Sequence, residues 1–148
     1  MFDRQRSSIL PPQRSGSQGI FVFYIVESSK SFYEAGFDLE PVVQRLGFVI
    51  LHTLDFSETL RRKGIDLDED CQVFEICNYR YAEKMLSIDM RLSLTIPWRI
   101  SIFTRNGATM IGVTRPETMN SVLSENAELA KLAAEIDTKM VMIVDETR

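Results

Sequence analysis

Cysteine and histidine are scarce in this sequence, which narrows the chemistry that the chain can perform. Its 148 residues include two cysteines and one histidine. If residues 71–77 form one strand, Cys71 and Cys77 lie roughly 20 Å apart on one face, too far apart for a disulfide. Their spacing matches no zinc pattern, and the single His52 does not complete one. The sequence therefore predicts two free thiols and no metal site.

Long apolar runs and the common catalytic motifs are also missing. No stretch reaches the roughly 20 apolar residues of a membrane-spanning helix. The first residues are polar where a secretory signal has an apolar core. Glycine-rich phosphate loops, a nucleophile elbow and the H-E-x-x-H motif are absent. We therefore expect a cytoplasmic protein without a membrane partner, and the absent motifs lean against an enzyme. No cofactor is indicated.

Positive charge is not in excess. The chain has 17 Lys and Arg against 21 Asp and Glu, a formal charge of −4. Domains that bind nucleic acids usually carry a basic excess, so a nucleic-acid partner is not expected. Hydrophobic residues make up 45% of the chain, which is enough to build one globular core at this length.

The composition changes after residue 19. Residues 1–19 are rich in Ser, Pro, Gly, Gln and Arg, which predicts a flexible N-terminal extension. Residues 20–148 then form a single α+β domain. It begins with Ile20–Val26, which is apolar on both alternating faces and is typical of an interior strand.

Two helix starts compete in the next segment. Ser31 and Glu34 have the spacing of a capping box, and a helix from there would run to Leu46. Pro41 would interrupt its hydrogen bonding. We favour the alternative, a new helix that is capped by Asp38 and has Pro41 in its first turn.

The strand predicted at Phe48–Phe56 contains the only histidine. Strict alternation places His52 on one face with its apolar neighbours at positions 48, 50, 54 and 56. A buried histidine of the core is the simpler interpretation, and a histidine that lines a pocket is the alternative. Ser57 is expected to cap a short helix that ends at Gly64.

The second half alternates strands and helices. Asn78 is expected to cap the helix after the strand Cys71–Cys77, and an Asn-Gly turn joins the two strands of a hairpin. This order predicts a two-layer α+β fold, a mainly antiparallel sheet covered on one face by helices. The hairpin strands are Pro97–Thr104 and Thr109–Arg115, and a long C-terminal helix buries Leu129, Leu132, Ala133, Ile136, Met140 and Ile143.

Two further side chains are candidates for chemistry, and a neighbouring tryptophan is expected in the core. Cys77 precedes a helix N-terminus, where the helix dipole can lower a thiol pKa, so it is the best candidate nucleophile. The alternative is an inert, buried cysteine. Arg99 could bind a carboxylate or phosphate, or be an ordinary surface arginine. Trp98 shares a face with Ile100 and Ile102, which indicates the core.

Three short segments resemble the domain-of-unknown-function 302 family. They are Leu46-Gly47-Phe48 followed by Asp55, then Phe74–Asn78 before a helix, and Ile96–Arg99 before a hairpin with an Asn-Gly turn. The resemblance covers about residues 20–144. The family shows proline where this chain has Tyr79, and a second motif cysteine where it has Trp98. With one cysteine of that pair replaced, a two-thiol redox or metal role is not expected.

The resemblance implies a fold similar to one half of the TATA-binding protein, usually as a homodimer. Cys77, Asn78, Pro97 and Arg99 match the family pattern directly and mark the expected site. No activity follows from the family. Our first hypothesis is therefore a homodimeric module that binds or senses a small molecule, with a site lined by these residues together with Trp98 and His52. The alternatives are a thiol-dependent enzyme or sulfur carrier that uses Cys77, and a protein–protein interaction or oligomerisation module.

Overall fold

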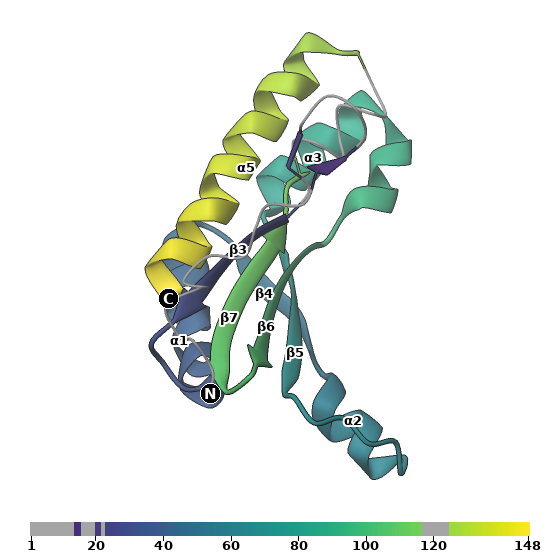
Figure 1. Cartoon of the computed structure of the whole chain (residues 1–148). Helices are drawn as coiled ribbons and strands as arrows, with labels where there is room; N and C mark the ends of the chain where they lie inside the picture. Colours follow the sequence, from purple (N-terminus) through teal and green to yellow (C-terminus); the bar gives the residue numbers. More distant parts are fainter. Residues whose placement is uncertain (1–13, 16–19, 22, 117–124) are drawn as a thin grey trace.

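A computed structural model describes residues 14, 15, 20, 21, 23–116 and 125–148 (Figure 1). Most of the predicted extension, residues 1–13 and 16–19, lies outside the described residues. Its described part forms a strand that pairs with residues 20 and 21. The elements in chain order are β1 Arg14–Ser15, β2 Ile20–Phe21, β3 Phe23–Ser28, α1 Phe32–Arg45, β4 Val49–Asp55, α2 Phe56–Arg62, β5 Cys71–Cys77, α3 Tyr79–Ile88, the 3₁₀ helix η3 Met90–Thr95, β6 Trp98–Arg105, β7 Ala108–Thr114 and α5 Ala127–Thr147.

The main sheet has five strands in the order β3-β7-β6-β5-β4, and each neighbouring pair is antiparallel. This confirms the predicted α+β fold. The first strand of this sheet, β3, lies at an edge, so the predicted interior position was wrong. Its two faces are both apolar because each contacts apolar side chains, although the strand is not an interior one. Val26 packs into the core, whereas Phe23 and Ile25 lie on the opposite face of the sheet.

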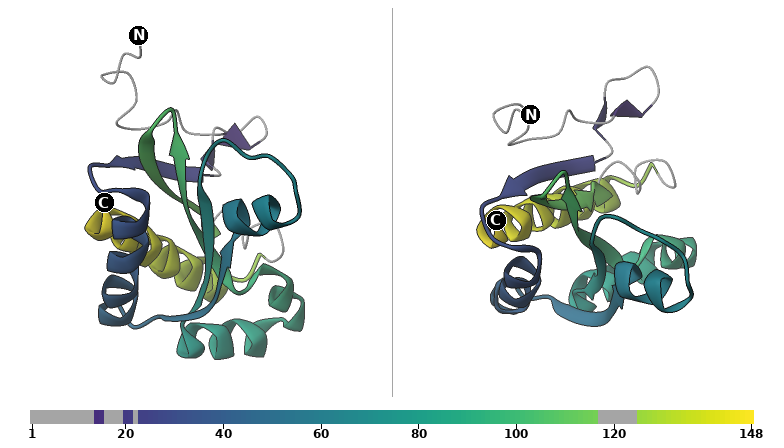
Figure 2. Two further views of the ribbon diagram at one scale, coloured as in Figure 1. Left: turned by 90° about the horizontal axis from the view of Figure 1, so that it is seen from below. Right: turned by 60° about the horizontal axis from the view of Figure 1, so that its bottom comes forward.

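The hydrophobic core lies between the sheet and the helices on one of its faces. Trp98, Ile100 and Ile102 of β6 are buried on this side, which we call the covered face. Helix α5 contacts β3, β7, α1 and α3, and α1 contacts β4 and β6. Figure 2 shows these helices gathered on one side of the sheet, and α2 projects beyond the ends of β4 and β5 in Figure 1. Among the described helices, none is long and apolar enough to cross a membrane.

Helix α1 is continuous through Pro41, so the predicted new helix at Asp38 was wrong. Ser31 is the cap, and its hydroxyl accepts a hydrogen bond from the Glu34 amide at 3.2 Å. Asp38 lies inside the helix and pairs with Lys30, with Oδ2 3.0 Å from Nζ. Proline is tolerated because Pro41 and Phe37 are both exposed, so the carbonyl that loses its amide partner is on the water-accessible side.

The short helix α2 is capped by Asp55 and not by Ser57. The Asp55 carboxylate accepts hydrogen bonds from the Glu58 amide at 2.9 Å and the Ser57 hydroxyl at 2.8 Å. Burial alone would raise the pKa of Asp55, but these hydrogen bonds, with one from Gln72, outweigh it and lower the pKa. Ser57 is buried, and its hydroxyl oxygen accepts a hydrogen bond from the Cys71 amide.

The hairpin and the C-terminal helix form as predicted. Asn106 and Gly107 have φ angles of 52° and 83°, the left-handed conformation that this tight turn requires. Helix α5 buries every residue that the helical spacing predicted to be buried. Two side-chain contacts join it to the sheet. Arg115 donates two hydrogen bonds to the Asp137 carboxylate, and the Tyr24 hydroxyl donates one to Asp145 at 2.6 Å.

Candidate functional site

A bulge in β4 moves the only histidine to the face of the sheet opposite the helices. Ile50 pairs with Ile76, but His52 pairs with the next residue, Glu75, so one extra residue is inserted in β4. The predicted shared face of His52 and Ile50 was therefore wrong. The side chain of His52 is 60% exposed, and its Nδ1 lies 3.7 Å from a carboxylate oxygen of Glu75.

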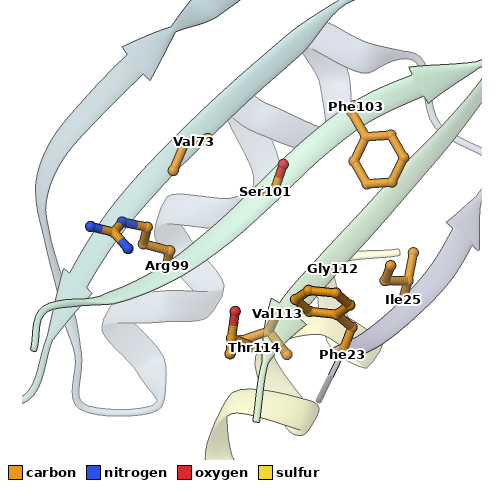
Figure 3. Close-up of a pocket in the computed structure, with 9 residues that line it drawn as sticks. All are labelled: Phe23, Ile25, Val73, Arg99, Ser101, Phe103, Gly112, Val113 and Thr114. Carbon is orange, nitrogen blue, oxygen red and sulfur yellow. The ribbon is translucent and has the colours of Figure 1, made fainter. Parts of the chain in front are cut away.

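The opposite face of the sheet, which we call the open face, contains a depression of about 280 Å³. Figure 3 shows its wall in two parts. Phe23, Ile25 and Phe103 lie toward β3 and β7, with Thr114 next to Phe23, whereas the Arg99 guanidinium and Val73 lie on the side of β5. The lining residues are Phe23, Ile25, Val73, Arg99, Ser101, Phe103, Gly112, Val113 and Thr114.

Glycine at position 112 forms part of this depression. A Cβ atom there would lie 2.8 Å from Cγ1 of Ile25 and 3.4 Å from the Tyr24 carbonyl oxygen. The missing side chain therefore lets Ile25 of the neighbouring strand lean over β7. Side chains on either side of Gly112 rise above it, so the depression exists because this position has none.

Three polar side chains line the depression. Arg99 is exposed, and its guanidinium makes no hydrogen bond or ion pair with any part of the chain that the structure describes. Ser101 contributes a hydroxyl group that lies near the Cys71 thiol. Thr114 lines the same depression, across from Ser101. One free cation and two hydroxyl groups next to apolar side chains form a surface suited to an amphipathic molecule.

Cys77 does not have the environment of an activated nucleophile. Alternation along β5 directs it to the open face, but it is only 6% exposed. Burial raises the pKa of its thiol, which is opposite to the lowering predicted from the helix N-terminus. The pKa of Cys71 is also raised, chiefly by burial. Both cysteines are free.

The other predicted site residues serve the fold. The Asn78 side chain caps α3 by accepting hydrogen bonds from the Arg80 and Tyr81 amides, each at 3.1 Å. It also donates to the Gly47 carbonyl at 3.0 Å. The peptide bond before Pro97 is cis. Asn78 thus joins the start of α3 to the residue before Phe48, and neither Asn78 nor Pro97 lines the depression of about 280 Å³.

Trp98 belongs to the core, as predicted. Its ring meets that of Phe48 edge to face, with centroids 5.9 Å apart. Its indole Nε1 is buried and finds no partner within the part of the chain that the structure describes. Trp98 and Arg99 point to opposite faces of β6, and both also line a smaller depression at the start of that strand.

Sequence reasoning missed most of the depression, although two signals were available. The face of β6 that carries Arg99, Ser101 and Phe103 mixes an aromatic ring with polar groups, and the first strand is apolar on both sides. Neither signal says which strands are neighbours, so the two faces could not be joined. Among the described residues, no group of three or more His, Cys, Asp and Glu side chains is placed to hold a metal ion.

Comparison with known proteins agrees with the motifs. Residues 24–147 match the family described as domain of unknown function DUF302. The chain belongs to the DUF302 family. The structure is similar to the crystal structure of an uncharacterized conserved DUF302 protein from Bacillus stearothermophilus, with 25% identity and a TM-score of 0.82. That match covers 87% of this chain and all of the other. No curated protein matches the chain. The predicted DUF302 resemblance is therefore confirmed, and it brings no activity with it.

Proposed function

We propose that this DUF302 chain is a homodimeric module that binds or senses a small molecule in the depression on its open face. One observation carries the proposal. The depression is walled by apolar side chains from β3 and β6, yet includes the guanidinium of Arg99, which has no partner among the described residues. Binding pockets for small molecules combine a mostly apolar wall with a few polar groups that orient the ligand. Saturable binding without turnover is expected.

A neutral fluorescent probe tests the proposal. N-phenyl-1-naphthylamine becomes fluorescent in an apolar site, and we expect saturable binding to the full chain. Phe103→Ala should weaken it by at least about fivefold, since part of the wall is lost. Phe37→Ala is the matched control because Phe37 is 83% exposed on α1, away from the depression. Equal loss in both variants, or no saturable binding to wild type, would contradict the proposal.

The homodimer in this proposal is supported by the edge of the sheet and by the family resemblance. Strand β4 has a neighbour on one side only among the described strands, and Val49 and Leu51 on it are exposed. Native mass spectrometry of the full chain, with a denatured spectrum alongside, should show twice the chain mass. A spectrum that shows only the monomer at every protein concentration would contradict the proposed homodimer.

We also propose that the protein is cytoplasmic, and its free thiols support this location. Cys71 and Cys77 remain unpaired, which is the usual state in a reducing compartment.

Two other functions remain predictions. A thiol-dependent enzyme or sulfur carrier requires Cys77 to react with iodoacetamide near neutral pH faster than Cys71 does. Because the Cys77 thiol is buried and its pKa is raised, we expect it to react more slowly than in a denatured chain.

An interaction module is favoured by the aromatic side chains of Tyr33 and Phe37, which are exposed one turn apart on α1. Removing residues 1–19 and finding no change in oligomer mass would exclude a role for the extension in assembly.

A further inference from the structure

The polar side of the depression continues into a second, smaller one. The second depression has a volume of about 110 Å³ and lies at the junction of η3 and β6. Arg99 and Thr114 line both depressions, so they stand where the two meet. The smaller depression is lined by Leu94, Thr95, Ile96, Pro97 and Trp98 in addition. A molecule bound where the two depressions meet would therefore contact Arg99 and Thr114, whether the rest of it lies in the larger or in the smaller depression.

The charge at this junction is positive and has no partner within the part of the chain that the structure describes. Arginine keeps its charge at all ordinary pH values. The nearest acid in register, Glu75, is opposite Arg99 in the β5–β6 ladder but lies within ion-pair distance of His52 instead. Arg99 itself has no ion pair with the described residues. An arginine fork next to a hydroxyl matches the two oxygens of a carboxylate.

The apolar side sets the size of the rest of the ligand. Phe23, Ile25 and Phe103 group together on the side of the depression away from the Arg99 guanidinium (Figure 3). A volume of about 280 Å³ is near the lower end of the range for small-molecule sites. A depression of this size suits a small molecule with a medium-length hydrocarbon part, and larger groups can extend beyond it into solvent.

We infer that the ligand is an amphipathic carboxylate of medium chain length, bound with its head group at Arg99 and Thr114. The hydrocarbon chain lies over Gly112, against Phe23, Ile25 and Phe103. This inference rests on the proposed binding function and adds the chemical class of the ligand. A neutral apolar molecule would leave the guanidinium without a partner, and a short polar anion would leave the aromatic wall uncovered.

Displacement of N-phenyl-1-naphthylamine by octanoate and by 1-octanol tests the inferred carboxylate separately from the proposed binding function. The two competitors have the same chain and differ in the charge of the head group. Octanoate, used below its micellar concentration, should displace the probe from the full chain at about tenfold lower concentration than 1-octanol, as expected for a charge-assisted contact. Arg99→Met keeps the apolar stem and should abolish this preference.

Arg105→Met is the matched control. Arg105 is an exposed arginine on the same strand and face as Arg99, at the turn end and outside the depression. It should keep the preference for octanoate. Equal displacement by both competitors, or equal loss in the two variants, would overturn the carboxylate while the binding function stands. Failure of the probe to bind wild type would overturn the carboxylate and the binding function together. A dimer in which the second copy covers the depression and excludes the probe would have the same consequence.

Discussion

The two faces of the five-stranded sheet are built from the same strands but have different consequences for the protein. On β6, Trp98, Ile100 and Ile102 point toward the helices and are almost completely buried. Their alternating neighbours Ser101 and Phe103 point to the open face and remain partly accessible. Close packing makes each covered side chain matter for stability. The open side chains are less constrained by packing and are available to bind.

The contrast extends to charged groups. On the covered face, Asp137 of α5 is 5% exposed and is held by two hydrogen bonds from Arg115. On the open face, Arg99 is exposed and unpaired among the described residues. The charge that joins α5 to the sheet is thus satisfied within the fold, whereas the charge beside the depression has no partner among the described residues. The following substitutions test this division, beginning with the largest expected effect.

Truncating alternate side chains of one strand should give unequal losses of stability. Ile100→Ala should lower the free energy of unfolding by about 3 kcal/mol, because it leaves a cavity under the helices. Phe103→Ala should cost about 1 kcal/mol, since its ring is only partly buried. Urea unfolding with linear extrapolation measures both. Similar losses for the two variants would mean that the open face is packed as tightly as the covered one.

Removing the charge that joins α5 to the sheet should have the next largest effect. Asp137→Asn leaves the Arg115 guanidinium without its carboxylate and should cost about 2 kcal/mol, less than for a fully buried pair because Arg115 is partly exposed. A double-mutant cycle with Arg115→Met isolates the pair from the other contacts of Arg115. Additive losses in that cycle would show that the two side chains do not stabilise each other.

Tyr24 should make stability depend on pH in the alkaline range. Burial, together with its hydrogen bond to Asp145, raises the pKa of Tyr24 to about 12. Because folding raises this pKa, the protonated hydroxyl stabilises the folded state. The stabilisation is fully present below the pKa of tyrosine in the unfolded chain, about 10. That stability is lost as the pH rises through 12. Tyr24→Phe should cost about 1 kcal/mol at pH 8, and the difference from wild type should disappear by pH 12 in thermal unfolding. A constant difference across this range would contradict the assigned hydrogen bond.

The sequence predicted those elements whose signals are local. Asn78 capped its helix, the Asn-Gly pair closed the hairpin, and the spacing of Leu129 to Ile143 placed the buried side of α5. Each of these depends on residues within one or two turns of each other. The helix through Pro41 could not be predicted in the same way. Whether proline interrupts a helix depends on which side of the helix is packed against the sheet.

The candidate site was predicted less well because it depends on strand order. Arg99, predicted as a side chain that could bind an anion, lines the depression, but Phe23, Ile25 and Gly112 of the same lining come from β3 and β7. No local pattern states that these strands lie beside β6. The predicted site joined residues that are adjacent in sequence, such as Trp98 and Arg99, which point to opposite faces of β6 and both line the smaller depression at its start.

His52 gives the smallest effect and the sharpest test of how the two faces are divided. The bulge in β4 puts it on the open face, so His52→Ala should change the free energy of unfolding by less than about 0.5 kcal/mol at pH 7. Ile50→Ala, two residues earlier on the covered face, is the matched control and should cost about 2 kcal/mol. A comparable loss for His52→Ala would place the histidine in the core, as strict alternation predicts. The small effect expected here would show that one inserted residue is enough to transfer a side chain from the packed face to the open one.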